Sequence, residues 1–406
     1  MTQCISCNHS IEPFISFGKQ PLGNGFLSKP QFKSEYFFEL EVCFCQSCSL
    51  VQLANQPKPE QMFNDAYSFF SGTSTKMAQH FERFADDIAS RYLKPHDPFV
   101  VELGSNDGIM LQHFAKRKIR HLGFEPSANV AAVAQSKGIN TRCSFFNQKH
   151  ASHAASEFGH ADAILAANVM CHIPYLHSVM EGMTALLKPT GIIAFEDPYL
   201  GDIVTKISYD QIYDEHVSLF SATSVKNLFE HHGMELIDTI PQPTHGGSMR
   251  YVIAPKGTRK VASSVTETLA REVANGLGSL KTFTRFKKSV EQSRADLKQL
   301  LNTFRKDHKR VVGYAATSKS TTVINYCSLT PDLIEFISDT TPIKQGKFSP
   351  GMHIPVLSYE RFKENYPDFA LLFGWNHQQE IFEKEKEYRS QGGQWVVYVP
   401  RVEIIG

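Results

Sequence analysis

The sequence predicts an α/β protein with a small metal-binding N-terminal domain, a central Rossmann-like domain and a C-terminal α/β Rossmann-like domain. Three observations lead to this fold class. Cysteines are concentrated near the N-terminus, short apolar segments alternate with helical patterns in the middle of the chain, and a similar alternation follows a long helical region. Strands that alternate with helices form a mostly parallel sheet covered on both faces. The expected divisions are 1–60 (metal-binding), 61–97 (helical connector contributing to the site), 98–255 (central domain), 256–308 (helical linker) and 309–406 (C-terminal domain).

Composition excludes several classes of function. The 42 Lys and Arg residues balance 41 Asp and Glu, so the net charge of +1 argues against a nucleic-acid binder that depends on neutralising phosphates. No run approaches the ~18–20 apolar residues that a membrane span needs. The first ten residues have neither the basic segment nor the apolar stretch of a secretory signal, so a cytoplasmic protein is expected. The oligomeric state is left open.

Five of the eight cysteines fall within the first 48 residues, at Cys4, Cys7, Cys43, Cys45 and Cys48. In a reducing compartment such a cluster indicates a metal site more often than disulfides. Each C-x-x-C pair brings two thiolates to one ion, and two pairs complete a tetrahedral structural zinc site. Cys43 is an alternative to Cys45, but the C-x-x-C spacing favours Cys45. The expected ligands are Cys4, Cys7, Cys45 and Cys48; redox-active or unpaired thiols are the alternative.

The segment before residue 60 is rich in turn-forming residues and has little helical periodicity. It is too short to be stabilised by apolar burial alone, so the metal is expected to supply the missing stability. From Ser74 to Tyr92 the pattern changes to that of an amphipathic helix. Its apolar residues, three or four positions apart, are Met77, Phe81, Phe84, Ile88 and Tyr92.

The central domain is predicted from its apolar runs and the helical segments between them. Strands are expected at 99–104, ending at 125, around 141, at 161–169 and at 191–198, with helices at 109–118, 129–137 and 176–187. Further along, Phe283, Val290, Leu297 and Phe304 recur every seven residues in a connecting helical region that Gly276 interrupts near its start. The strands expected after it are 310–316, 333–339, 369–375 and 394–400.

The segment ELGSNDG, residues 102–108, lies where the first central strand passes into a helix. A glycine-rich turn there lets a ligand approach the backbone N–H groups of the helix N-terminus. The dinucleotide pattern G-x-G-x-x-G is not matched, so S-adenosylmethionine (SAM) is favoured over a dinucleotide or a turn that binds nothing. An acid at the next strand end is placed for the ribose hydroxyls, and an asparagine ends the strand at 161–169. The expected cofactor residues are Glu102, Gly104, Asn106, Gly108, Glu125 and Asn168.

Two clusters that follow strand ends carry groups suited to proton transfer. The first ends in His172, and the second is Tyr213-Asp214-Glu215-His216. A histidine acts as a general base near neutral pH, and a neighbouring carboxylate fixes its tautomer. A lone histidine is more often structural, so these residues alone leave both roles open.

Several motifs taken together resemble the nucleotide-sugar C-methyltransferases of deoxysugar biosynthesis. They are the two C-x-x-C pairs, ELGSNDG, GFEPSANVAAVA (123–134), NVMCHI (168–173), YDEHVSLF (213–220) and HGGSMRY (245–251). The resemblance covers nearly the whole chain. It implies an N-terminal zinc domain, a central SAM-binding methyltransferase domain and a C-terminal α/β domain.

The resemblance also implies the reaction, which is methylation at carbon 3 of a nucleotide-linked 4-keto-6-deoxy sugar. In this interpretation His216 is the leading general base, supported by Glu215, while Tyr213 and His172 hold or polarise the ketone. Tyr67 closes the site from the segment after the zinc domain. The physical logic is that a proton next to a ketone becomes removable when a base is positioned and the enolate oxygen is stabilised.

The C-terminal domain opens with the turn 313–320, where family members often have more glycine than this chain. Thr317, Ser318 and Lys319 suit the pyrophosphate of a sugar nucleotide, with a plain packing turn as the alternative. Arg250, in HGGSMRY, is expected to bind substrate as well. Two other functions compete: an O- or N-methyltransferase for another small molecule, and a non-catalytic zinc-stabilised protein that binds SAM or a nucleotide. A sensor needs no base, which argues against the latter.

Overall fold

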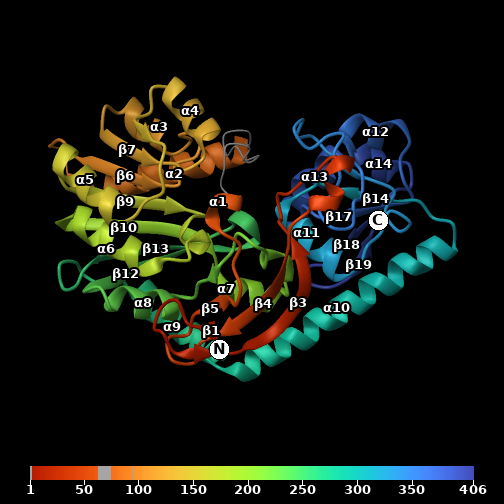
Figure 1. Ribbon diagram of the computed structural model, residues 1–406, viewed down its shortest axis with the longest axis horizontal. Coiled ribbons are helices and arrows are strands. Elements are labelled where there is room, and N and C mark those ends of the chain that lie inside the picture. Colours follow the sequence, from red (N-terminus) through yellow and green to blue (C-terminus); the bar gives the residue numbers. More distant parts are fainter. Residues whose placement is uncertain (1, 63–74, 95) are drawn as a thin grey trace.

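The computed structural model describes residues 2–62, 75–94 and 96–406. The N-terminal strands lie between the central domain and the C-terminal domain, and the long helix α10 (Leu280–Lys306) runs beneath them to join the two (Figure 1). Within these residues, no helix has the length and apolar character needed to cross a bilayer.

The N-terminal segment forms a sheet that the sequence did not predict. After the hairpin β1 (Thr2–Gln3) and β2 (Ser10–Ile11), it is an antiparallel sheet in the order β11-β5-β4-β3. Its strands are β3 (Pro13–Pro21), β4 (Phe37–Phe44), β5 (Val51–Leu53) and β11 (Ser218–Leu219), with a 3₁₀ helix η1 (Lys29–Ser34) and α1 (Pro59–Met62) alongside. Strand β11 belongs to the central domain, so this sheet is completed across a domain boundary.

The expectation that metal alone supplies the stability of this segment needs correction. Phe14 and Phe44 pack against Phe283 of α10, with ring centroids 5.1 and 4.4 Å apart. Phe17 packs edge-on against Tyr326 of α11 (Ser318–Tyr326) at 4.9 Å. The segment therefore buries a substantial apolar face, but against helices more than 200 residues away in the sequence. A short segment can be stabilised in this way because its core is shared with a larger neighbour.

The central domain is the predicted α/β unit, built on a seven-stranded sheet in the order β12-β13-β10-β9-β6-β7-β8. Its strands are β6 (Phe99–Leu103), β7 (Arg120–Phe124), β8 (Thr141–Arg142), β9 (Ala161–Ala167), β10 (Leu187–Pro198), β12 (Met234–Gln242) and β13 (Ser248–Pro255). One face packs against α2 (Thr75–Arg91), α3 (Leu111–Lys116) and α4 (Ala128–Ser136), and the other against α5 (Gln148–Phe158), α6 (Leu176–Leu186) and α8 (Ala222–Glu230).

Several features of this domain were missed, among them helices α7 (Leu200–Lys206) and α8. Strands β12 and β13 add an antiparallel edge to the otherwise parallel sheet. Helix α5 was missed because its buried face consists of Ala151 and Ala154, and small side chains among polar ones give no apolar stripe for a sequence reading to detect.

The four strands expected in the C-terminal domain are present, whereas its two edge strands were not predicted. Gly276 separates α9 (Ser263–Ala274) from α10, and the seven-residue series in α10 is buried throughout. The C-terminal sheet has the order β16-β15-β14-β17-β18-β19 and is parallel except for its last pair. Its elements are β14 (Val311–Tyr314), β15 (Ile337–Asp339), β16 (Val356–Ser358), β17 (Phe369–Leu372), β18 (Gln394–Val397), β19 (Glu403–Ile405), α12 (Tyr359–Glu364), α13 (Gln378–Lys384) and α14 (Lys386–Ser390).

Candidate active site and zinc centre

One cavity of about 330 Å³ brings together the motifs that the sequence singled out in separate places. It lies at the carboxyl edge of the central sheet, where open α/β sheets bind ligands. The predicted residues that line it are Gly104, Asn106, Glu125, Asn168, His172, Tyr213, Glu215, His216, Thr317, Ser318 and Lys319. Tyr67 lies outside the described residues, and its expected role stays a prediction.

The turn after β6 is shaped for close approach to a ligand. Gly104 has a φ of 59°, and a Cβ at this position would collide with the Val169 side chain, so only glycine fits. The backbone N–H of Asn106 donates to the Glu125 carboxylate at 3.0 Å, and that of Ser127 does so at 2.9 Å. These two bonds fix the position of the Glu125 carboxylate beside the turn. Burial raises the pKa of the Glu125 carboxyl.

Glu102 and Gly108 lie behind the turn, and neither lines the cavity. Burial, followed by the charges of Glu125 and Asp107, raises the pKa of the Glu102 carboxyl well above its usual value. A Cβ on Gly108 would press on Ile139. The two residues therefore support the turn from beneath. The sequence had instead predicted that they contact the cofactor directly.

His216 is held in one tautomer. Its Nδ1–H donates to the Gln211 carbonyl at 2.6 Å, so its Nε2 lone pair accepts the Tyr213 hydroxyl at 2.9 Å. The His172 ring stacks beside it, with centroids 5.4 Å apart. Burial lowers the pKa of His172 to about 4 and the pKa of His216 well below its usual value. Both imidazoles are therefore neutral near pH 7, the form in which a histidine accepts a proton.

Two lysines of the C-terminal domain face the same cavity. Lys319 lies 5.7 Å from the Trp375 ring, and Lys344 donates to the Ala316 carbonyl at 2.7 Å. Burial lowers the pKa of both ammonium groups. Thr317 caps the N-terminus of α11 by accepting the Ser320 N–H at 3.1 Å. Two half-buried lysines beside a capped helix N-terminus are suited to an anion.

The four predicted metal ligands lie together in the N-terminal segment, away from the cavity. The sulfurs of Cys4, Cys7, Cys45 and Cys48 all lie within 4.8 Å of one another, with Cys4–Cys48 and Cys7–Cys45 distances of 3.4 Å. Cys43 is buried outside this group, so Cys45 is the ligand. Four converging thiolates fit a closed tetrahedral zinc centre, because all four positions are filled by protein.

Comparison with known proteins identifies the family. Family models described as a zinc binding domain, a methyltransferase domain and a C-methyltransferase C-terminal domain match residues 4–63, 76–239 and 243–400. The chain is 33% identical to the C-methyltransferase NovU of Streptomyces niveus over 406 residues, which cover 99% of this chain and 96% of that protein. The chain belongs to the C-methyltransferase family. It is a SAM-dependent enzyme with a structural zinc centre. This family assignment decides against the two alternative functions, an O- or N-methyltransferase and a non-catalytic binding protein.

Solved structures of lower similarity to this C-methyltransferase include two further methyltransferases. A SAM-dependent methyltransferase from Clostridium acetobutylicum is 11% identical, with a TM-score of 0.34, over 44% of this chain and 92% of that one. Magnesium protoporphyrin IX methyltransferase from Synechocystis, with bound SAH, is 14% identical, with a TM-score of 0.33, over 43% of this chain and 82% of that one.

The side chains that line the cavity of the C-methyltransferase have the chemistry that SAM requires. Phe81, Phe124 and Phe146 line the cavity with aromatic surface that would suit an adenine, and the Glu125 carboxylate offers acceptors that would suit ribose hydroxyls. Gly104 and Asn106 line the same cavity, where the backbone is open to close approach by a ligand. The zinc centre lies elsewhere and takes no part in this cavity.

Arg250 of the C-methyltransferase was expected to bind substrate, but it is not among the residues that line the cavity. Its guanidinium, 5% exposed, lies 3.0 Å from Glu196 and 3.6 Å from Asp87, and stacks 3.6 Å above the Phe84 ring. Arg250 and Glu196 are paired across β13 and β10 in the sheet, so their side chains share one face. Arg250 therefore stabilises the packing of α2 on the sheet.

Asn24 is a cavity residue that the sequence analysis missed. Its Nδ2 donates to Glu215 at 2.7 Å, and its Oδ1 accepts the Ser318 hydroxyl at 2.8 Å. Thr321 donates to the neighbouring Gly23 carbonyl at 2.9 Å. The N-terminal turn thus links the histidine cluster to the C-terminal domain. The only signal in the sequence was the Gly-Asn-Gly run at 23–25, which is typical of a turn of any function.

Cys45→Ser is expected to abolish zinc binding by the C-methyltransferase, because three thiolates leave the tetrahedral site open. Cys43→Ser is the matched control, since Cys43 is a buried neighbour outside the ligand set. Metal analysis of protein purified without chelators checks both variants. About one zinc per chain is expected for the wild type and for Cys43→Ser. Less than about half an equivalent in the wild type contradicts the assignment.

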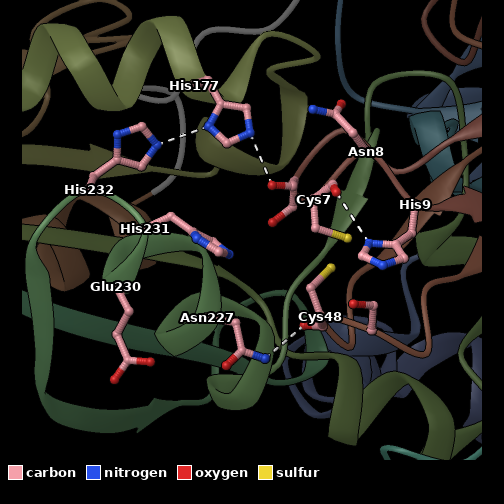
Figure 2. Close-up of a pocket in the computed structure, with 11 residues that line it drawn as sticks. Cys7, Asn8, His9, Cys48, His177, Asn227, Glu230, His231 and His232 are labelled. Atoms are coloured by element: carbon pink, nitrogen blue, oxygen red, sulfur yellow. Dashed lines mark hydrogen bonds between the residues drawn. The ribbon is translucent and has the colours of Figure 1, made fainter.

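A chain of two histidines fastens the zinc centre of the C-methyltransferase to its central domain (Figure 2). His232 donates to His177 Nδ1 at 2.9 Å, and His177 Nε2–H donates at 3.0 Å to the carbonyl of Ser6, which lies between two cysteine ligands. Asn227 of α8 donates to the Cys48 carbonyl at 3.1 Å. Hydrogen bonds to the backbone carbonyls of Ser6 and Cys48 therefore join the zinc-binding segment to the central domain.

His177→Leu should lower the free energy of unfolding by about 1–3 kcal/mol, because it leaves the buried Ser6 carbonyl and His232 without their partner. The zinc content should not change, since His177 is not a ligand. Urea unfolding and metal analysis measure the two effects. His153→Leu, at an exposed position on α5, is the control. Equal unfolding midpoints for the two variants would show that the histidine chain adds no stability.

Proposed function

We propose that the enzyme methylates carbon 3 of an NDP-4-keto-6-deoxy sugar by base-catalysed formation of an enolate. One observation carries the proposal. The SAM turn, the His172–His216 pair and two lysines of the C-terminal domain, Lys319 and Lys344, line a single cavity. Such an arrangement suits an acceptor with an acidic C–H bond at one end and a diphosphate at the other.

The first step follows from the tautomer of His216. With Nδ1–H donated to Gln211, Nε2 is the atom that takes the proton from carbon 3. Tyr213, which now donates to Nε2, is free to turn its hydroxyl to the ketone oxygen when substrate displaces that bond. The electron pair of the broken C–H bond moves to the ketone oxygen, and His172 and Tyr213 stabilise the enolate there.

Bound SAM supplies an electrophilic methyl group to the enolate carbon. The new carbon–carbon bond at C3 forms as the carbon–sulfur bond breaks, and the ketone is restored. Glu215, held by Asn24, lines the same cavity as His216 and is assigned the role of balancing the proton that His216 takes up. The residues of the chain otherwise orient the acceptor and exclude water.

The diphosphate is assigned to Lys319 and Lys344 together with Thr317 and Ser318 at the N-terminus of α11. Both lysines are half-buried, and burial lowers the pKa of their ammonium groups, so a bound anion would compensate for their charge. Lys319 has a partial counter-ion in Asp210, whose carboxylate is held by Trp375 and Tyr398 at 2.6 and 2.9 Å. A bound diphosphate supplies the remaining negative charge.

Incubation with methyl-labelled SAM and a panel of NDP-4-keto-6-deoxy sugars tests this function. Mass spectrometry of the fragmented product should place the label on carbon 3 of the sugar. Methylation at another carbon would correct the position, and methylation of a non-sugar carbon acid with none of the panel accepted would overturn the substrate class.

A further inference from the structure

The turn Thr244–Gly247, which contains η5 (Thr244–Gly246), is the junction between the two halves of the cavity. A Cβ on Gly246 would collide with the Trp375 ring of the C-terminal domain. On the other side, Thr244 donates to Glu196 of β10 at 2.9 Å. Lys206 donates to the Gly246 carbonyl, and Gln211 donates to the His245 carbonyl at 2.5 Å. Four separate elements therefore determine where His245 lies.

The His245 side chain meets Asn168 inside the cavity. The Asn168 Nδ2 donates to His245 Nε2 at 2.9 Å, and both side chains line the cavity. Both residues have a φ of 54°, in the left-handed region that is uncommon for any residue other than glycine. Such conformations persist where the surrounding structure enforces them, and they are concentrated at functional sites.

The imidazole of His245 is uncharged under working conditions. Burial lowers its pKa to about 3, and the neighbouring charge of Lys319 acts in the same direction. A neutral ring with its proton on Nδ1 is the form that accepts the Asn168 amide through Nε2. The hydrogen bond is therefore present throughout the neutral range.

Asn168 connects this bond to the cofactor side. It follows the end of β9, its backbone N–H donates to the Glu196 carbonyl at 2.7 Å, and the next residue, Val169, presses on Gly104 of the SAM turn. A shift of Asn168 is thus transmitted to the turn that approaches the cofactor. The turn that carries His245, in contrast, also reaches the C-terminal domain, through the close approach of Gly246 to Trp375.

We infer that His245 is a positioning residue: through Asn168 it holds the methyl donor in line with the acceptor bound by the C-terminal domain. This inference rests on the proposed function and extends it to a residue that takes no part in proton removal. Loss of the bond should therefore separate the two steps. Deprotonation depends on His216, whereas methyl transfer depends on alignment, and a misplacement near 1 Å costs a reaction about 100-fold.

His245→Asn and His245→Gln form the matched test. Asparagine tolerates the left-handed backbone but is too short to reach Asn168, whereas the glutamine carbonyl reaches it as an acceptor. For His245→Asn we expect methyl transfer to fall by about 10- to 100-fold, while exchange of the sugar C3 proton in deuterated water stays close to wild type. The dissociation constant of S-adenosylhomocysteine, measured by calorimetry, should rise. His245→Gln should recover most of both properties.

Asn168→Ala, alone and combined with His245→Asn, completes the test. If the two residues act as a unit, the double variant transfers methyl no more slowly than the worse single variant. Parallel losses of exchange and transfer, or additive effects, would show a merely structural residue and overturn the inference. Should His245→Asn fail to fold, Asn168→Ala must show the same loss of transfer with exchange retained. If the wild type neither exchanges nor methylates any sugar of the panel, the proposed function fails, and an unchanged S-adenosylhomocysteine affinity then overturns the role of His245 as well.

Discussion

His216→Gln should lower methyl transfer by at least about 100-fold, the range lost when a positioned general base is removed. Glutamine is close in size and has no group that takes a proton, so the fold and the SAM turn, which His216 does not contact, should be unaffected. Calorimetric binding of S-adenosylhomocysteine should match wild type. Exchange of the sugar C3 proton in deuterated water, followed by NMR, should be lost together with methyl transfer.

Two control variants show whether loss of activity in His216→Gln is specific to the general base. His153→Gln, exposed on α5, should leave both activities unchanged. His172→Gln measures the contribution of the stacked second histidine, whose centroid is 5.4 Å from that of His216. Exchange retained in His216→Gln but lost in His172→Gln would transfer the role of base to His172.

Lys319→Ala and Lys344→Ala should each raise the dissociation constant of the nucleotide sugar by about 10- to 100-fold, which corresponds to loss of a charge-assisted hydrogen bond of about 1.5–3 kcal/mol. S-adenosylhomocysteine affinity should not change. The effect should also appear with the nucleoside diphosphate alone and vanish with the free nucleoside, because the lysines are assigned to the phosphates. Calorimetry with these three ligands makes the comparison.

Lys347→Ala is the matched control, since Lys347 belongs to the same loop as Lys344 but does not line the cavity. An unchanged affinity in Lys319→Ala is incompatible with phosphate contact. In that case the turn 313–320 only packs the domain, which was the alternative that its low glycine content left open.

Much of the fold was predictable because its signals are local. The strands β6, β9 and β10 each contain a short apolar run, and the seven-residue series of α10 requires no knowledge of its partners. The sheet of the N-terminal segment was missed for the opposite reason. Its apolar face is covered by Phe283 and Tyr326, which are brought there only by the completed fold. The turn-forming residues of the N-terminal segment therefore indicated a series of turns, whereas the folded segment is a sheet.

The candidate site divides in the same way. The two C-x-x-C pairs were predicted because their residue types and spacing suffice. The sequence also singled out the Tyr213–His216 cluster, but the roles of its residues came from the family resemblance and stay predictions. The choice of Cys45 over Cys43 was also predictable, and the convergence of the four sulfurs confirms it. The ion pair of Arg250 was not predicted, because its motif does not reveal which face of β13 its side chain occupies or that Glu196 lies beside it.

Residue order and spacing were enough to specify the α/β class, the zinc ligands and the identity of the groups available for proton transfer, because each depends on neighbours a few positions away. Three-dimensional folding alone decided that the N-terminal segment is a sheet sharing its core with α10, and that Asn24 and His245 belong to the same cavity as His216. Asn24 is 191 residues from Glu215 and Asn168 is 77 from His245, yet each pair is joined by a hydrogen bond. Contacts at such separations arise from how whole sheets and helices pack, which no local pattern encodes.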